Sequence, residues 1–100
     1  KINQERKLKN TMRIDKFLKV ARVLKRRTVA KELANHQRIV INGKTAKPSM
    51  EIHENDIVEV IFGHRKLTIK ILAINPHPSK KDAGMLYEVL DESFINTPAE

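Results

Sequence analysis

The feature that most constrains this chain is a strongly basic, amphipathic stretch at residues 12–28, with the sequence MRIDKFLKVARVLKRRT. At about 100° per residue, its apolar side chains fall on one helical face, formed by Ile14, Phe17, Leu18, Ala21 and Leu24. The opposite side carries Lys16, Lys19 and Arg26, with Arg22 at its edge. One face can therefore pack on a core, while the other presents a cationic stripe.

This stripe is unusual because bases do not alternate with acids along it. On an ordinary solvated helix the two signs alternate and pair, whereas residues 12–28 hold seven Lys or Arg and the single acid Asp15. The imbalance belongs to one end of the chain. Residues 1–27 hold eleven Lys or Arg against two acids, and residues 28–100 hold nine against ten, within a net charge of +8. A one-signed surface at one end predicts an anionic partner, and nucleic acid is favoured over a merely solvated face.

Length and composition exclude several classes of function. One hundred residues suit one domain with a modest core. The chain has no cysteine, its four histidines lack zinc-ligand spacing, and it contains no phosphate-binding glycine loop or nucleophile elbow. No apolar run approaches membrane-spanning length. We therefore expect a cytoplasmic protein that is not an enzyme, holds no metal or cofactor and does not enter a membrane.

Hydrophobic periodicity predicts two helices followed by a sheet. The first helix should span residues 13–25, and the second should span residues 29–35 with Thr28 as its N-cap. Arg26 and Arg27 then lie on the basic corner between the helices, with their side chains pointing outward and adding little to the core. Strands are expected at residues 38–41, 44–47, 57–62, 67–74 and 85–90, with a helical turn at residues 80–84 and a frayed end after Asp91. The fold class is thus α+β, and three regions are expected: a flexible basic leader at 1–11, a domain at 12–74 and an extension at 75–100.

The residues also carry a family resemblance. Arg13-Ile14-Asp15, Leu18, Arg26-Arg27-Thr28, Ala30, Arg38-Ile39-x-Ile41-Asn42-Gly43 and Asn55-Asp56 resemble the RNA-binding domain named after ribosomal small-subunit protein four, the S-four domain. A looser match through Phe62-Gly63 and Lys81-Asp82-Ala83 to Tyr87 is similar to RqcP-type ribosome-associated quality control factors, which are relatives of a small ribosome-binding heat-shock protein. The family usually has glycine in place of Gln37 and Asn55. Asn55 tolerates positive φ at small cost, whereas Gln37 does so less readily.

The resemblance implies two helices packed on a small, mostly antiparallel sheet (the alpha-L motif), with RNA on the helical face. It further implies binding to rRNA and peptidyl-tRNA on obstructed large ribosomal subunits, support of an RqcH-type factor that adds alanines to stalled chains, and a monomer off the ribosome. A heat-shock-type factor that recycles large subunits carrying peptidyl-tRNA, and a more general rRNA- or tRNA-binding protein, are the alternatives within this class. An S-four module of an enzyme would need a second domain, and a helix–turn–helix DNA regulator would place its charge on the second helix rather than the first.

The expected RNA-binding residues combine the cationic stripe with positions matched to the family: Arg13, Asp15, Lys16, Lys19, Arg22, Arg26, Arg27, Thr28, Arg38 and Lys44. Arginine forks can grip phosphates bidentately. Asp15 cannot bind phosphate. We expect it to orient Arg13 or Lys16, or to accept from a ribose hydroxyl or base amine; the alternative is a helix-dipole partner in the first turn.

Overall fold

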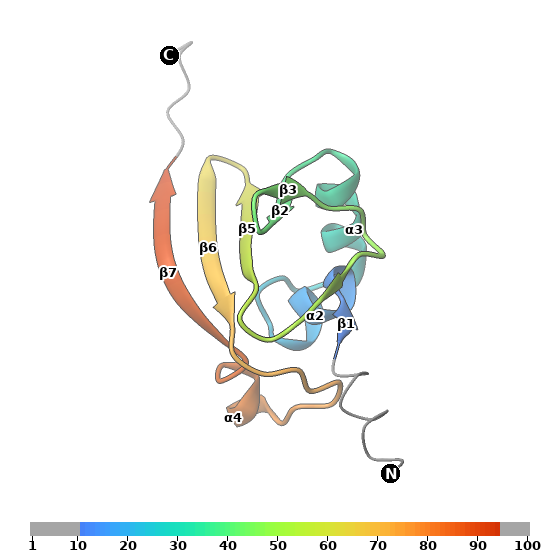
Figure 1. Ribbon diagram of the computed structural model, residues 1–100, viewed down its shortest axis with the longest axis vertical. Coiled ribbons are helices and arrows are strands. Elements are labelled where there is room, and N and C mark those ends of the chain that lie inside the picture. The colour runs from blue at the N-terminus through green and yellow to red at the C-terminus, as the bar shows by residue number, and fades with distance from the viewer. Residues whose placement is uncertain (1–10, 95–100) are drawn as a thin grey trace.

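An antiparallel five-stranded sheet carries two helices on one face in the computed structural model, which describes residues 11–94 (Figure 1). The helices are α2 (Ile14–Val20), α3 (Arg27–Asn35) and the short α4 (Lys80–Ala83). The large sheet has the order β3-β2-β5-β6-β7, and its strands are β2 (Ile39–Ile41), β3 (Lys44–Thr45), β5 (Ile57–Phe62), β6 (Arg65–Ile71) and β7 (Tyr87–Phe94). A small second sheet pairs β1 (Met12–Arg13) with β4 (Glu51–Ile52). The predicted α+β class, with two N-terminal helices on an antiparallel sheet, is confirmed.

The core forms where alternate strand residues meet the apolar face of the helices. In β6, the buried residues Leu67, Ile69 and Ile71 alternate with the half-buried Lys66, Thr68 and Lys70 on the outer face. All five apolar positions predicted for the first helical face, Ile14, Phe17, Leu18, Ala21 and Leu24, are buried in this core. Each of the four larger side chains in this set contributes about 1.5–3 kcal/mol. This packing fixes the orientation of the cationic side of α2.

The first helix is shorter than predicted, because its chain turns left-handed at Arg22. The expected span of residues 13–25 is wrong at its C-terminal end: α2 stops at Val20, Ala21 caps it, and Arg22 has φ +63°. The Arg22 N–H donates to the Lys19 carbonyl and the Val23 N–H to the Leu18 carbonyl, which together make a Schellman motif. The hydrophobic period continues to Leu24 although the helix does not. This is why periodicity alone overestimated the length of the helix.

The second helix begins two residues earlier than predicted. α3 starts at Arg27, its N-cap is Arg26, and no side chain caps it, so the assignment of Thr28 as N-cap is wrong. Arg26 has the extended backbone that the N-cap position requires, whereas Thr28 lies exposed inside the first turn. Arg27 is thus the first helical residue rather than part of the corner between the helices.

Two parts of the sheet were not foreseen. β1 and β4 pair Met12 with Ile52 and Arg13 with Glu51, although the sequence predicted helix at Arg13 and no strand at residues 51–52. β7 continues to Phe94, although the sequence predicted a frayed end after Asp91. The register along β6 shifts between Thr68 and Ile69, and β7 stays paired on both sides of the shift. The leader predicted at residues 1–11 lies outside the described residues except for Thr11, and the three-region division stays a prediction.

Candidate nucleic-acid interface

A buried carboxylate at the start of α2 holds two arginines. The Asp15 side chain is 0% exposed. Arg13 binds it in a bidentate fork, with Nε donating to Oδ1 at 3.2 Å and a terminal nitrogen donating to Oδ2 at 3.0 Å. Arg27 approaches Oδ1 from the other side, at 3.3 Å. One negative charge therefore orients two positive ones, and the cluster keeps a net positive charge.

Backbone pairing far from α2 in sequence positions this cluster. The Ile14 N–H donates to the Met50 carbonyl at 2.8 Å, and Arg13 pairs with Glu51 in the small sheet. Arg27 comes from the first turn of α3, which packs beside α2. The expectation that Asp15 orients Arg13 is confirmed by the fork. Complete burial removes its alternative role as an acceptor from ribose or base, because no RNA atom can reach it.

The Arg27 side chain contributes more to the fold than its predicted outward orientation implied. Its side chain is 41% exposed and pairs with Asp15, and its Nε is buried. Among residues 11–94, no acceptor lies within hydrogen-bond distance of that Nε. The buried Nε and the ion pair to Asp15 together hold the Arg27 side chain in place. The exposed part of Arg27 is therefore presented in a defined direction, and its side chain is tied to the buried Asp15 rather than simply pointing outward as expected.

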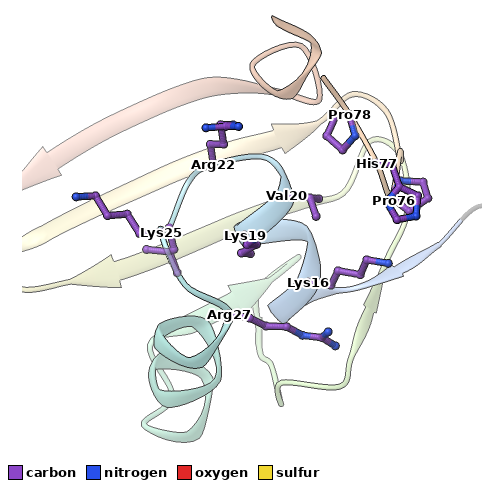
Figure 2. Close-up of a pocket in the computed structure, with 10 residues that line it drawn as sticks. Lys16, Lys19, Val20, Arg22, Lys25, Arg27, Pro76, His77 and Pro78 are labelled. Atoms are coloured by element: carbon purple, nitrogen blue, oxygen red, sulfur yellow. The ribbon is translucent and has the colours of Figure 1, made fainter. Parts of the chain in front are cut away.

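Beside this cluster lies a groove of about 730 Å³, here called the α2 groove (Figure 2). Figure 2 shows Lys16 and Lys19 on α2, Arg27 at the start of α3, and the loop between β6 and α4 facing them. The groove is bounded by two helices, the turn between them and this loop, and its lining residues are Lys16, Lys19, Val20, Arg22, Leu24, Lys25, Arg27, Pro76, His77 and Pro78. It brings four of the predicted RNA-binding residues together: Lys16, Lys19, Arg22 and Arg27.

The cations of the α2 groove are largely free to bind an external anion. Within residues 11–94, the salt bridges involve Arg13, Arg27, His53, Arg65 and Lys66 only. Lys16, Lys19, Arg22 and Lys25 have no acidic partner in that part of the chain. Clustered cations on a concave surface bind phosphates, and guanidinium forks add directional hydrogen bonds. The chemistry suits a polyanion backbone rather than a small neutral ligand.

The remaining predicted residues lie outside this groove. Four of them are exposed. Arg26 is the N-cap of α3 and Thr28 lies in its first turn, whereas Arg38 follows the end of α3 and Lys44 begins β3. Arg13 faces a different depression, described below. None of these positions lines the α2 groove.

Sequence reasoning missed the loop that closes the α2 groove. Residues 76–78 were assigned to the C-terminal extension without a role in the site, yet they line the groove opposite Lys16. Lys25 was recognised as basic but was not included among the site residues. The position of residues 76–78 across the groove from α2 depends on how the extension folds back, and no local pattern of the sequence signals it.

Replacing Arg22 tests whether its side chain binds RNA in the α2 groove. Glycine suits a left-handed backbone better than any other residue, so Arg22→Gly is expected to stabilise the fold by about 1 kcal/mol. The same change should weaken RNA binding, because it removes a groove cation. Thermal melting and filter binding to tRNA measure both effects. A variant that melts higher and binds RNA as the wild type does would exclude Arg22 from the interface.

Within residues 11–94, no three His, Asp or Glu side chains gather in a geometry that could hold a metal ion. No described helix combines the length and apolar character needed to cross a membrane.

Comparisons with known proteins point in one direction. Residues 12–58 match the S4 domain model, which describes the S-four domain. A Streptococcus pneumoniae protein named RQC P-site tRNA stabilizing factor is 48% identical over 84% of this chain and 96% of its own length. A Bacillus subtilis protein of the same name is 43% identical over 84% of this chain and 98% of its own. The solved trimeric structure of Vibrio cholerae heat shock protein 15 superposes with a TM-score of 0.72 at 30% identity, covering 79% of this chain and 81% of that one. These findings confirm the resemblance to the S-four domain and to quality control factors.

Proposed function

The chain belongs to the S4 domain family, and from that premise we propose that it binds rRNA and tRNA on large ribosomal subunits obstructed by peptidyl-tRNA. The proposal extends to this chain what the name of its relatives states of them, namely stabilisation of a P-site tRNA. Its role is to hold RNA rather than to catalyse a reaction.

One observation carries the proposal: the α2 groove gathers unpaired cations around an arginine that Asp15 holds in place. Phosphate contacts supply affinity and position a protein on RNA. Fixing Arg27 before binding reduces the conformational entropy that binding would otherwise cost. A groove of this kind suits an RNA backbone presented by the ribosome or by the acceptor or anticodon arm of a tRNA.

The finer proposal concerns the step that binding serves. Held beside a P-site tRNA in the cytoplasm, the protein would support an RqcH-type factor that extends the stalled chain with alanines. The test is genetic. Cells that lack the protein should lose alanine tails on a stalled reporter, the wild-type chain should restore them, and the Arg27→Ala variant should not.

A heat-shock-type role in recycling obstructed subunits is the second candidate, because the fold also matches heat shock protein 15. The requirement for the protein in alanine tailing separates the two roles, whereas sedimentation does not. Both predict co-sedimentation with large subunits that carry peptidyl-tRNA. Only the quality control role predicts that the protein is required for alanine tails. Absence from large subunits with and without peptidyl-tRNA would contradict both.

Binding should be strongly dependent on salt. Each neutralised phosphate contributes a slope of roughly −0.7 to −0.9 in log affinity against log salt. With the five cations of the α2 groove engaged, affinity for tRNA should fall roughly 100- to 500-fold between about 50 and 200 mM salt. Fluorescence anisotropy with labelled tRNA measures the slope. A flat dependence would contradict an interface made of phosphate contacts.

A further inference from the structure

Gln37 occupies a backbone position where glycine would cost less. It follows the capping residue of α3 and has φ +58°. Its N–H donates to the Ala34 carbonyl at 3.0 Å, and the Arg38 N–H donates to the Leu33 carbonyl at 2.8 Å, which completes a Schellman motif. Glycine makes the same two hydrogen bonds without steric strain. The backbone therefore gives no reason for a side chain here.

The Gln37 side chain lines a second depression, the α3 groove, which has a volume of about 600 Å³. This groove lies between the end of α3 and the segment that follows β3. Its polar lining includes three cations, two amides and two hydroxyls, contributed by Arg13, Lys31, Lys47, Asn35, Gln37, Thr45 and Ser49. Among residues 11–94, neither lysine has an acidic partner. The positive charge of the groove is thus available to an external anion.

The two grooves share one anchor. Arg27 lines the α2 groove and Arg13 lines the α3 groove, and both guanidiniums bind the same buried Asp15. Each groove also contains the left-handed residue that ends a helix, Arg22 in the first and Gln37 in the second. Strained positions persist where a side chain is needed, and they concentrate at functional sites.

We propose that the α3 groove is a second RNA site, distinct from the α2 groove. Arg13, Lys31 and Lys47 would hold a phosphate, while the Gln37 amide would hydrogen-bond to a base edge or a ribose hydroxyl. An amide both donates and accepts, so it can distinguish between nucleotides, which lysines cannot do. The proposal rests on the proposed function and adds a second contact, so that one protein can hold two segments of RNA on either side of Asp15.

The Gln37→Gly variant is expected to raise the stability of the fold and to lower its affinity for RNA. Relief of the left-handed strain should raise the melting temperature by about 4–8 °C. Loss of the amide should weaken RNA binding by roughly three- to tenfold. The probes are purified tRNA and tRNA-free large ribosomal subunits, assayed separately. Weaker binding of tRNA alone assigns the groove to tRNA, and weaker binding of subunits alone assigns it to rRNA.

Asn55→Gly is the matched control. Asn55 is also left-handed, at φ +75°, but lies in the turn before β5 and lines neither groove. Its replacement should raise the melting temperature, by less than Gln37→Gly because asparagine tolerates this backbone better, and should leave the affinity for both probes unchanged.

A pair of lysine variants completes the test. Lys47→Ala should weaken binding to the same probe as Gln37→Gly, whereas Lys70→Ala, on the outer face of β6, should not. Wild-type affinity for both probes in either Gln37→Gly or Lys47→Ala would overturn the second site. If Lys19→Ala still weakens binding in that case, the α2 groove and the proposed function stand. If the wild-type chain itself binds neither probe, the proposed function fails first.

Discussion

An Asp15→Ala variant is expected to lose about 2–3 kcal/mol of folding stability and to bind RNA at least tenfold more weakly while still folded. The carboxylate is completely buried and neutralises part of two guanidiniums, so its loss leaves them to repel each other. Both are nearly half exposed and can turn to solvent, which places the cost at the lower end of the range for buried pairs. Their defined direction, and with it the preorganised RNA surface, is lost.

Melting curves and tRNA binding measured below the transition test this expectation. Asp15→Asn should lose less, because its oxygen can still accept from Arg13, and Asp15→Arg should lose most, because it places a third guanidinium at a buried position. Asp56→Ala is the matched control. Its carboxylate accepts from the Asn42 side chain and the His53 N–H, away from both grooves. That variant should lose stability and keep its affinity for RNA. Normal RNA binding by Asp15→Ala would show that the arginines need no anchor.

An Arg27→Ala variant is expected to bind RNA about ten- to a hundredfold more weakly. Arg27 is the guanidinium of the α2 groove that is already oriented, and its loss removes a charge-assisted contact to phosphate. Because it also pairs with Asp15 at 3.3 Å, the variant should lose about 1 kcal/mol of stability. Co-sedimentation with large subunits, together with circular dichroism melting, measures both effects.

Arg26→Ala is the control that separates position from charge. Arg26 is the neighbouring residue, has the same charge and is exposed, and it has no acidic partner among residues 11–94. Its replacement should change stability by less than about 0.5 kcal/mol and weaken binding much less than Arg27→Ala. Equal losses from the two variants would mean that the charge of this corner matters and its geometry does not.

Features that depend on local periodicity could be predicted from the sequence. The buried face of α2, the strands β2, β5 and β6, and the left-handed turn at Asn42 and Gly43 all follow from patterns a few residues long. The end of α2 could not be predicted in this way, since Arg22 adopts a conformation that its residue type disfavours. A Schellman motif without glycine gives no compositional signal.

The candidate site was predictable in its charges but not in its arrangement. The excess of Lys and Arg identified the basic side of α2, and the family resemblance singled out Arg13, Asp15 and Arg27. That Asp15 is buried between the other two depends on β1 pairing with β4 and on α3 packing beside α2. Such contacts between distant segments leave no periodic signature, and the same is true of the loop at residues 76–78.

The pairing of β1 with β4 also has a consequence for the order of events during synthesis. It joins parts of the chain that are 40 residues apart. The hydrogen bond from the Ile14 N–H to the Met50 carbonyl attaches the start of α2 to the same segment. A helix of seven residues is not stable in water by itself. A growing chain therefore displays its positive charge early but acquires the oriented arginines only once residue 52 has emerged and folded back. The ability to grip RNA in a defined geometry is a late product of tertiary folding.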